Sequence, residues 1–353
     1  MKVLHVIATS PLDSMGVTTA LRAIAGAQAA IGMDVRIMAQ GGWPIGPSDR
    51  VPVVECGARD LPRVLDRLAD GKTIIHTHVP WRLPALAPLY VARRDRRFVH
   101  SPHGSLAPAA LATRGRRKKL AWAALFRRAI RSHDLLVVNS AAEQADVEHL
   151  RLGRPVVCIP HPLELPEPRA RGSRHPRTVA FLGRIHPIKG VLELVRAWRS
   201  LGPEAAGWTL KIAGPVEDGE YMAAVQAAAD GDPTIELLPP VYGDDRWRFL
   251  ADAGLVAVPS KSENFCYIVA EALAVGTPVL TTTGVPWPAI DEHRLGWRGQ
   301  GTVTGLREQL GRALRTSPTA LTAMGSRGRL HIEAELGYVA VARGYERAYG
   351  PGF

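Results

Sequence analysis

The chain has 353 residues, 46% of them hydrophobic, and a formal net charge of +11, so it is long enough for two domains of ordinary size, each with its own core. Three widely spaced cysteines argue against a disulfide framework or a zinc site, and no run of about eighteen apolar residues is present to span a bilayer. The opening residues become polar too soon for a secretory signal, so we expect a cytoplasmic protein.

The first elements predict an α/β fold. Residues 2–9 have the pattern of a buried strand, residues 17–31 have helical spacing, and residues 34–39 are a second apolar run. A strand–helix–strand opening is typical of a doubly wound parallel sheet. The loop over residues 10–16 is then expected at the carboxyl edge of the sheet, where ligands bind. Gly16, which ends this loop, is a candidate binding residue, although a plain turn would use the same glycine.

Two strands further along the chain end in histidines. The strand over residues 73–77 leads to His78, and side-chain alternation places His76 and His78 on one face. Two histidines in this arrangement can bind a metal, but the sequence shows no third ligand, so a cleft-edge role and a structural role stay equally open. The strand over residues 97–101 leads into Pro102, His103 and Gly104. An imidazole at such a strand end can donate or accept a hydrogen bond, although a lone histidine is usually structural.

The charge excess is concentrated in one segment. Residues 93–131 contain twelve Lys or Arg and one acid, an excess as large as that of the whole chain. Within it, residues 114–131 have the pattern of a basic amphipathic helix, which suits a packed helix with a solvated face, an anionic membrane surface or a nucleic acid. No helix-turn-helix, zinc-finger or RNA-binding motif supports the last, so we expect no nucleic-acid partner. The cations of this membrane or acceptor patch are Arg114, Arg116, Arg117, Lys118, Lys119, Arg127 and Arg128.

A second sheet follows a linker. Residues 163–176 are rich in proline and charge without periodicity, which is typical of a connection between domains. The strand over residues 178–182 is followed by a loop from Gly183 to Gly190 and by a helix with one apolar face. In this loop Arg184 offers a planar fork of donors and Lys189 a point charge, a combination suited to a diphosphate. Incidental surface cations in an ordinary turn are the alternative.

The most informative stretch covers residues 255–283. A buried strand is followed by a loop and by a helical apolar stripe, which Gly276 and Pro278 end. Glu263 lies in the loop, and Glu271 lies beside the stripe, where an acid needs a partner because desolvating an unpaired carboxylate is costly. The N–H groups at the helix start form an anion site. These features suit a nucleotide ribose and diphosphate, whereas two solvated helix acids are the alternative.

These stretches resemble the retaining glycosyltransferases of family 4, which have the GT-B fold and include enzymes of surface-polysaccharide synthesis. The resemblance covers most of the chain and is strongest over residues 179–287. It rests on the loop G-R-x-x-x-x-K-G at residues 183–190 and on Glu263 and Glu271 in the pattern P-S-x-S-E-N-F…E-A-L-A-x-G-T-P-V. The loop P-H-G-x-L at residues 102–106 is also similar to the family.

The resemblance implies a role for each matched residue. Arg184 and Lys189 would neutralise the diphosphate leaving group, Glu263 would hold the donor sugar, Glu271 would hold the ribose, and His103 would face the transferred hexose. The residues implied in donor binding are Gly16, Gly183, Val241, Asn264, Phe265, Cys266, Tyr267, Ile268 and Glu271.

The sequence departs from the family at one of these positions and directly before another. Cys266 stands where family members usually have glycine, which would allow positive φ and close approach of the backbone to phosphate. Met15 stands in place of the first glycine of an N-terminal pair, so only Gly16 is carried over.

We therefore expect two Rossmann-like doubly wound parallel-sheet domains that face each other across a cleft. The predicted segments are an acceptor-binding domain over residues 1–165, a linker over 166–176, a nucleotide-sugar-binding domain over 177–335, and a last helix over 336–353 that crosses back. The predicted reaction moves a hexose, with retention, from a UDP- or GDP-sugar to a hydroxyl of a carbohydrate or lipid-linked saccharide. No metal or other cofactor is expected, and peripheral association with the inner face of the plasma membrane stays open.

Two other functions are left as alternatives. A non-hydrolysing nucleotide-sugar epimerase shares this fold and needs no acceptor. A non-enzymatic anion-binding protein would be favoured if Arg184 and Glu271 did not face one cleft.

Overall fold

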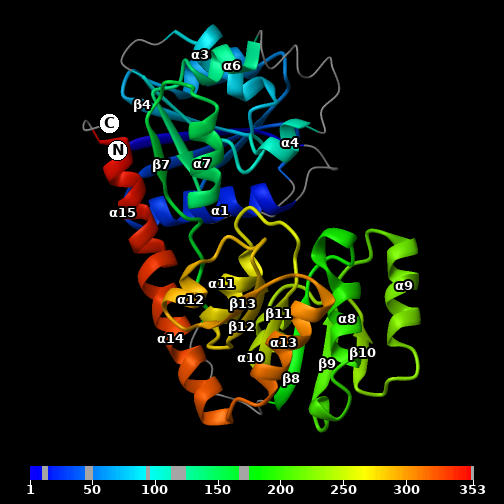
Figure 1. Ribbon diagram of the computed structural model, residues 1–353. Coiled ribbons are helices and arrows are strands. Elements are labelled where there is room, and N and C mark those ends of the chain that lie inside the picture. Colours follow the sequence, from blue (N-terminus) through cyan, green and yellow to red (C-terminus); the bar gives the residue numbers. More distant parts are fainter. Residues whose placement is uncertain (10–14, 44–50, 93–95, 113–124, 167–174, 351–353) are drawn as a thin grey trace. The chain divides into compact units, whose positions relative to one another are not determined.

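The computed structural model describes residues 1–9, 15–43, 51–92, 96–112, 125–166 and 175–350 (Figure 1). The chain divides into two compact units, the first formed by Met1–Glu164 with Glu335–Phe353 and the second by Leu165–Ala334. The segment expected as a linker, residues 166–176, lies mostly outside the described residues. No helix of the described ranges combines the length and the apolar character that crossing a membrane requires.

The first unit contains a seven-stranded sheet in the order β3-β2-β1-β4-β5-β6-β7, in which all neighbouring strands are parallel. Its strands are β1 (Lys2–Ala8), β2 (Asp34–Gln40), β3 (Val53–Cys56), β4 (Thr73–His78), β5 (Arg97–Ser101), β6 (Leu135–Val138) and β7 (Val156–Cys158). Its helices are α1 (Met15–Ala30), α2 (Leu61–Leu68), η1 (Leu83–Leu86), α3 (Ala87–Tyr90), α4 (Pro108–Ala112), α6 (Arg127–Ile130), α7 (Ala141–His149) and α15 (Tyr338–Tyr349).

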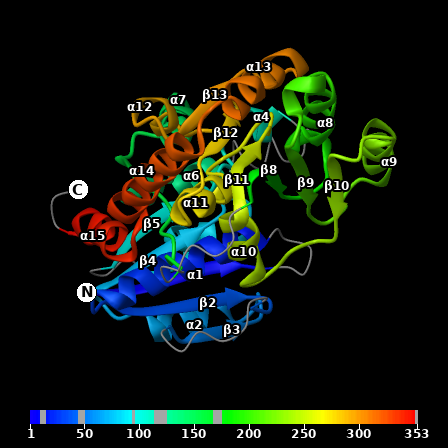
Figure 2. The same ribbon diagram turned by 90° about the horizontal axis from the view of Figure 1, so that it is seen from below.

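Each face of this sheet buries its own core. Val3 and Ile7 of β1 pack in a cluster with residues of α1 and α15, which lie side by side in Figures 1 and 2. Leu4 and Val6, which alternate with them, pack in a second cluster with α2. By the same alternation, His5 takes a position on the α1 and α15 face that would otherwise hold an apolar side chain.

The second unit contains a six-stranded sheet in the order β10-β9-β8-β11-β12-β13, again with parallel neighbours. Its strands are β8 (His175–Leu182), β9 (Thr209–Ala213), β10 (Ile235–Leu238), β11 (Ala253–Val258), β12 (Val279–Thr282) and β13 (Gly296–Gly299). Its helices are η3 (Pro187–Lys189), α8 (Val191–Arg199), η4 (Gly202–Ala205), α9 (Gly219–Ala229), α10 (Asp245–Asp252), α11 (Tyr267–Ala274), α12 (Ala289–Glu292), α13 (Val303–Leu314) and most of α14 (Pro318–Leu336). The expected apolar stripe of α8 is buried in one core with α13, and the two helices lie side by side in Figure 2.

Both sheets have the strand order of a doubly wound fold. The order reverses between β1 and β4 in the first sheet and between β8 and β11 in the second. Ligands of such sheets bind beyond the carboxyl ends of the strands at this switch point. The loops after β8 and β11, which carry the charged residues predicted from the sequence, therefore start where a ligand site is expected.

Candidate functional site

Lys189 and Glu263 come together at the switch point of the second sheet. Lys189 ends η3 after β8, Glu263 lies in the loop after β11, and Nζ is 2.5 Å from Oε1. Both side chains are mostly buried, with 19% and 13% of their surface exposed. Because an ammonium group has three donors, Lys189 can keep Glu263 and still donate to an anionic ligand.

Gly190 allows the two loops to approach this closely. Its φ is +68°, and a Cβ at this position would lie 2.2 Å from the carbonyl oxygen of Pro259. The backbone N–H of Lys261 also donates to the carbonyl of Ile188 across the same contact, at 2.8 Å. The loop after β8 is therefore held against the end of β11, and this contact fixes the position of Lys189.

Arg184 lies on the exposed side of the same loop. Its Nη1 donates to Oε1 of Glu217 at 2.6 Å, and half of the Arg184 side chain is exposed. The hydrogen bond from Arg184 lowers the pKa of Glu217, with a weaker contribution from the charge of Lys189. Since exposed ion pairs contribute less than about 1 kcal/mol, an anionic ligand can displace Glu217 from Arg184 at little cost.

Glu271 is held by a partner that the sequence analysis did not identify. Arg246 of α10 places Nη2 3.4 Å from Oε1 of Glu271, and only 12% of the Glu271 side chain is exposed. Burial raises the pKa of Glu271, and the positive charge of Arg246 opposes the shift. The expectation that an acid beside the buried stripe takes a partner is confirmed.

The start of α11 connects these charged groups. Burial raises the pKa of the Cys266 thiol well above its ordinary value, and the charges of Glu263, Lys189 and Glu271 act on the same thiol. The charge of Lys189 also acts on Glu217, the partner of Arg184. Arg184 and Lys189 follow β8 in the chain, and Glu263 and Glu271 follow β11, the two strands of the switch point.

Cys266 itself adopts the conformation that favours glycine. Its φ is +68°, and it caps the N-terminus of α11, whose first N–H groups have no partner within the helix. The backbone shape usual for glycine is therefore kept at this departure from the family. The other residues predicted to bind the donor lie near the same strand ends. Gly183 follows β8, Asn264 and Phe265 follow β11, and Tyr267 and Ile268 form the first turn of α11. Val241 is half-buried after β10.

In the first unit, His103 lies directly after β5 in a left-handed conformation with φ of +53°. Such a φ is uncommon outside glycine and often occurs at functional sites. Nε2 of His103 lies 2.8 Å from Nδ1 of His78, the last residue of β4. Burial, with a smaller effect from His5, lowers the pKa of His103 to about 4. The partly exposed ring is therefore neutral at pH 7.

Glu143 fixes the turn at His103 through a contact that no local sequence pattern indicates. Its carboxylate accepts the N–H groups of Gly104 through Oε1 and of Asn139 through Oε2. Burial raises the pKa of Glu143, and these two N–H donors oppose the shift. The Ser140 hydroxyl accepts the N–H of Glu143 and so caps the start of α7. That local spacing indicates where α7 starts but not that its acid reaches Gly104.

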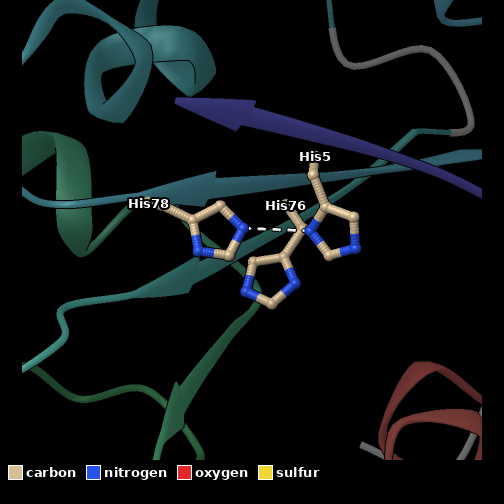
Figure 3. A group of neighbouring side chains, drawn as sticks. All are labelled: His5, His76 and His78. Atoms are coloured by element: carbon tan, nitrogen blue, oxygen red, sulfur yellow. Dashed lines mark hydrogen bonds between the residues drawn. The ribbon is translucent and has the colours of Figure 1, made fainter. Parts of the chain in front are cut away.

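His76 and His78 lie on one face of β4, as expected, but the apparent lack of a third histidine was wrong. His5 of β1 is paired in register with His76, and Figure 3 shows the three rings together. Their nearest nitrogens lie within 4.8 Å of one another, so the three could hold a metal ion. Each ring nitrogen already has a hydrogen-bond partner, however, and burial lowers the pKa of all three. A metal would have to displace bonds that satisfy the neutral rings.

Two other predicted features are placed differently or not described. Gly16 lies in the first turn of α1, which begins at Met15, so its assignment to the preceding loop was wrong. A Cβ at Gly16 would meet no described atom within 4 Å, so no close contact among the described residues requires glycine there. In the basic segment, Arg127 and Arg128 begin α6. The patch residues Arg114, Arg116, Arg117, Lys118 and Lys119 lie outside the described residues.

Comparison with known families covers both units. Residues 15–166 match the family described as Glycosyltransferase Family 4, and residues 176–315 match Glycosyl transferases group 1. A D-inositol 3-phosphate glycosyltransferase of Kineococcus radiotolerans is 28% identical over 288 residues, which cover 72% of this chain and 66% of that protein. The chain thus spans slightly less than two thirds of that relative.

Solved structures share the fold at low identity. Sucrose-phosphate synthase from Thermosynechococcus elongatus has a TM-score of 0.74 and 17% identity, covering 99% of this chain and 98% of that chain. Anabaena HepE in complex with UDP and glucose has a TM-score of 0.74 and 14% identity, covering 98% of each chain.

Two doubly wound parallel-sheet units with these neighbours define the GT-B fold. With both family matches, the chain belongs to glycosyltransferase family 4. The expected fold and family are thereby confirmed. The donor, the acceptor, retention of configuration and a role in polysaccharide synthesis stay predictions.

Proposed function

We propose that the protein is a retaining glycosyltransferase that moves a hexose from a UDP- or GDP-sugar to a hydroxyl group of a saccharide acceptor in surface-polysaccharide synthesis. The observation that carries this proposal is the Lys189–Glu263 pair at the switch point of the second sheet. An acid that can accept sugar hydroxyls lies there beside a cation that can receive a diphosphate. A UDP-sugar is the first donor to test, because the similar HepE structure contains UDP and glucose.

The chemistry follows from where charge develops. As the bond between the hexose and the diphosphate breaks, negative charge grows on the leaving oxygens, and fixed cations stabilise that change most. Lys189 is preorganised by Glu263 and Gly190, whereas Arg184 can move from Glu217 to the ligand. The leaving diphosphate takes the acceptor proton on the same face of the sugar, so no side chain acts as a nucleophile.

The remaining residues position the substrates. Glu263 accepts hydrogen bonds from the donor sugar, and Glu271, oriented by Arg246, accepts those of the ribose hydroxyls. His103 makes a hydrogen bond to a sugar hydroxyl. The N–H groups at the start of α11 face the diphosphate, which their partial positive charge favours.

Turnover by two variants tests the site. Lys189→Ala should lower kcat roughly 10²- to 10³-fold, as expected for loss of one donor to developing charge. Glu263→Ala should also lower kcat, whereas Lys261→Ala is the matched control, because this exposed lysine in the same loop pairs with Glu193. Near-normal turnover of every accepted donor by both site variants would refute the assignment.

The donor and acceptor are found by a panel. Thermal shifts with UDP-, GDP- and ADP-sugars identify the base, and the anomeric configuration of the product decides whether the transfer retains it. The acceptor panel includes saccharides, lipid-linked saccharides and an inositol phosphate, the last because of the name of the Kineococcus relative. Sugar epimerisation and nucleotide release without any acceptor would point to an epimerase instead.

A lipid-linked acceptor would place the enzyme at a membrane surface. The basic segment supplies cations for anionic lipids, each worth about 1 kcal/mol near such a surface. Replacement of Arg116, Arg117, Lys118 and Lys119 by Ser should abolish sedimentation with anionic vesicles. Unchanged sedimentation would exclude docking through this segment.

A further inference from the structure

A continuous chain of buried hydrogen bonds runs through the first unit to His103. Gln28 of α1 contacts His5 of β1, His5 contacts His78 of β4, and His78 contacts His103 after β5. The successive distances are 2.8 Å from Gln28 Oε1 to His5 Nε2, 2.9 Å from His5 Nδ1 to His78 Nε2, and 2.8 Å from His78 Nδ1 to His103 Nε2. Figure 3 shows the central step between His5 and His78.

The hydrogen bonds between Gln28 and His103 all have one donor-to-acceptor direction, which the Gln28 amide sets. Its Oε1 can only accept, so His5 must carry its proton on Nε2 and accept at Nδ1. His78 must then donate from Nε2 to His5 and accept at Nδ1. His103 must in turn donate from Nε2 to His78, which leaves its Nδ1 without a proton.

These proton positions require each imidazole ring to be neutral, and burial favours the neutral form. Gln28, His5 and His78 are completely buried. Burial lowers the pKa of His5 to about 4 and that of His78 well below its ordinary value. At pH 7 each of these rings therefore carries one proton, and each proton has one assigned position.

Tyr349 holds the Gln28 amide in the required orientation. Nε2 of Gln28 donates to the Tyr349 hydroxyl at 3.1 Å, and that hydroxyl lies 2.7 Å from Nδ1 of His76, to which it donates its own proton. His76 then donates from Nε2 to Ser101 Oγ at 2.8 Å. A rotated Gln28 amide would reverse every bond of the chain and place a proton on Nδ1 of His103.

We propose that Gln28, His5 and His78 are positioning residues that hold His103 as its Nε2–H tautomer, so that Nδ1 accepts a hydrogen bond from a hydroxyl group of the bound saccharide. Among the described residues, no group hydrogen-bonds Nδ1 of His103, and the ring is partly exposed. The role toward the saccharide rests on the proposed function, whereas the tautomer does not. The chemical preference is for a hydroxyl donor at this position over an ether or carbonyl acceptor.

Nitrogen-15 NMR of the histidine rings tests the tautomer without any substrate, because protonated and unprotonated ring nitrogens have well separated shifts. In the wild type at pH 7, His103 should show a protonated Nε2 and an unprotonated Nδ1. Tyr349→Phe should convert this signal to a mixture, because Gln28 loses the acceptor that orients it. The matched control is Tyr345→Phe on the same helix, since this buried hydroxyl bonds neither Gln28 nor His76. If Tyr349→Phe does not fold, Gln28→Leu provides the same comparison.

Kinetics then tests the role toward the saccharide. Tyr349→Phe should lower kcat roughly tenfold with little change in the KM of the nucleotide sugar, as for other residues that orient a functional imidazole. A proton on Nδ1 of wild-type His103, or an unchanged tautomer in both Tyr349→Phe and Gln28→Leu, would overturn the proposal. A stoichiometric transition metal bound by His5, His76 and His78 would also overturn it, since the metal would occupy their lone pairs. If no donor is turned over, the NMR result still decides the tautomer while the proposed function fails.

Discussion

The two units use the same place in the sheet for opposite kinds of polar cluster. In the first unit, His5, His76 and His78 lie side by side on β1 and β4 and are fully buried. His5 bonds His78, and His76 bonds the neutral partners Tyr349 and Ser101. In the second unit, the loops after β8 and β11 bring together Lys189 and Glu263 as a charged pair that keeps some exposure. Burial of a charge requires a partner, whereas a neutral imidazole needs only hydrogen bonds.

The difference separates two functions that polar groups serve in a site. Charges that retain contact with water can exchange one partner for a ligand, as Arg184 can leave Glu217. Buried neutral rings cannot exchange partners, because a buried donor or acceptor would then have no hydrogen bond. They instead fix the donor-to-acceptor direction of the hydrogen bonds around them. The second cluster is therefore suited to receive charge, and the first to orient a hydroxyl.

Among the tests of this comparison, acidification should give the largest difference in stability between the two units. His5 has its pKa lowered from 6.5 to about 4, so below pH 6.5 the unfolded chain binds a proton that the folded unit does not accept. The stability of the first unit should fall by up to about 1.4 kcal/mol per pH unit, or about 3 kcal/mol by pH 4, from His5 alone. His76 and His78 act in the same direction, and Glu143, whose pKa is raised, opposes them.

In the second unit, Glu271 reverses the effect of falling pH on folding stability. Its raised pKa means that the folded unit takes up a proton at higher pH than the unfolded chain, so Glu271 contributes stability in mild acid, while Glu217, whose pKa is lowered, opposes it. Amide hydrogen exchange, corrected for its intrinsic pH dependence, would compare β1 and β4 with β8 and β11 between pH 7 and 5. Equal changes in protection in both sheets would contradict the contrast between them.

Glu143→Gln should destabilise the first unit by about 2 kcal/mol. The carboxylate accepts one backbone N–H on each oxygen, whereas an amide has one acceptor oxygen and would turn an NH2 group toward the other N–H. Urea unfolding gives the free energy, with the exposed Glu148→Gln on the same helix as the control. Equal stability of the two variants would show that Glu143 does not clamp the turn at His103.

Cys266 offers a test of similar size on the charged side of the comparison. Cys266→Val should cost about 2 kcal/mol, because a β-branched side chain is strained at φ of +68°. Cys266→Gly should stay within about 1 kcal/mol of the wild type, since relief of strain offsets the lost thiol and the freer unfolded chain. Thermal or urea unfolding measures both, and a glycine variant as unstable as the valine variant would contradict the conformational reason.

Glu217→Gln should have the smallest effect on stability, below about 0.5 kcal/mol, because the pair with Arg184 is half exposed. Binding of the nucleotide sugar should become tighter, since Arg184 no longer has a competing carboxylate. Calorimetry of donor binding checks this, with Glu236→Gln, which removes an exposed pair with Lys211, as the control. Weaker donor binding by Glu217→Gln would show that Glu217 orients Arg184 instead of competing for it.

Local sequence patterns determined the doubly wound fold and the charged loops. Apolar runs and helical stripes predicted the strands and helices, and Arg184, Lys189, Glu263 and Glu271 stand within two short stretches whose spacing alone relates them to a strand end and a helix start. Segments of this kind are organised by backbone geometry over a few residues, so a single sequence suffices to predict them.

Only the tertiary structure decided which distant residues meet. His5 joins His76 because β1 pairs with β4 in one particular register, Glu143 reaches Gly104 from another strand connection, and Arg246 reaches Glu271 from the preceding helix. In a parallel sheet, neighbouring strands are separated by whole crossover connections, so residues in contact lie far apart in the sequence. Register and helix packing set these contacts, and no local spacing encodes them.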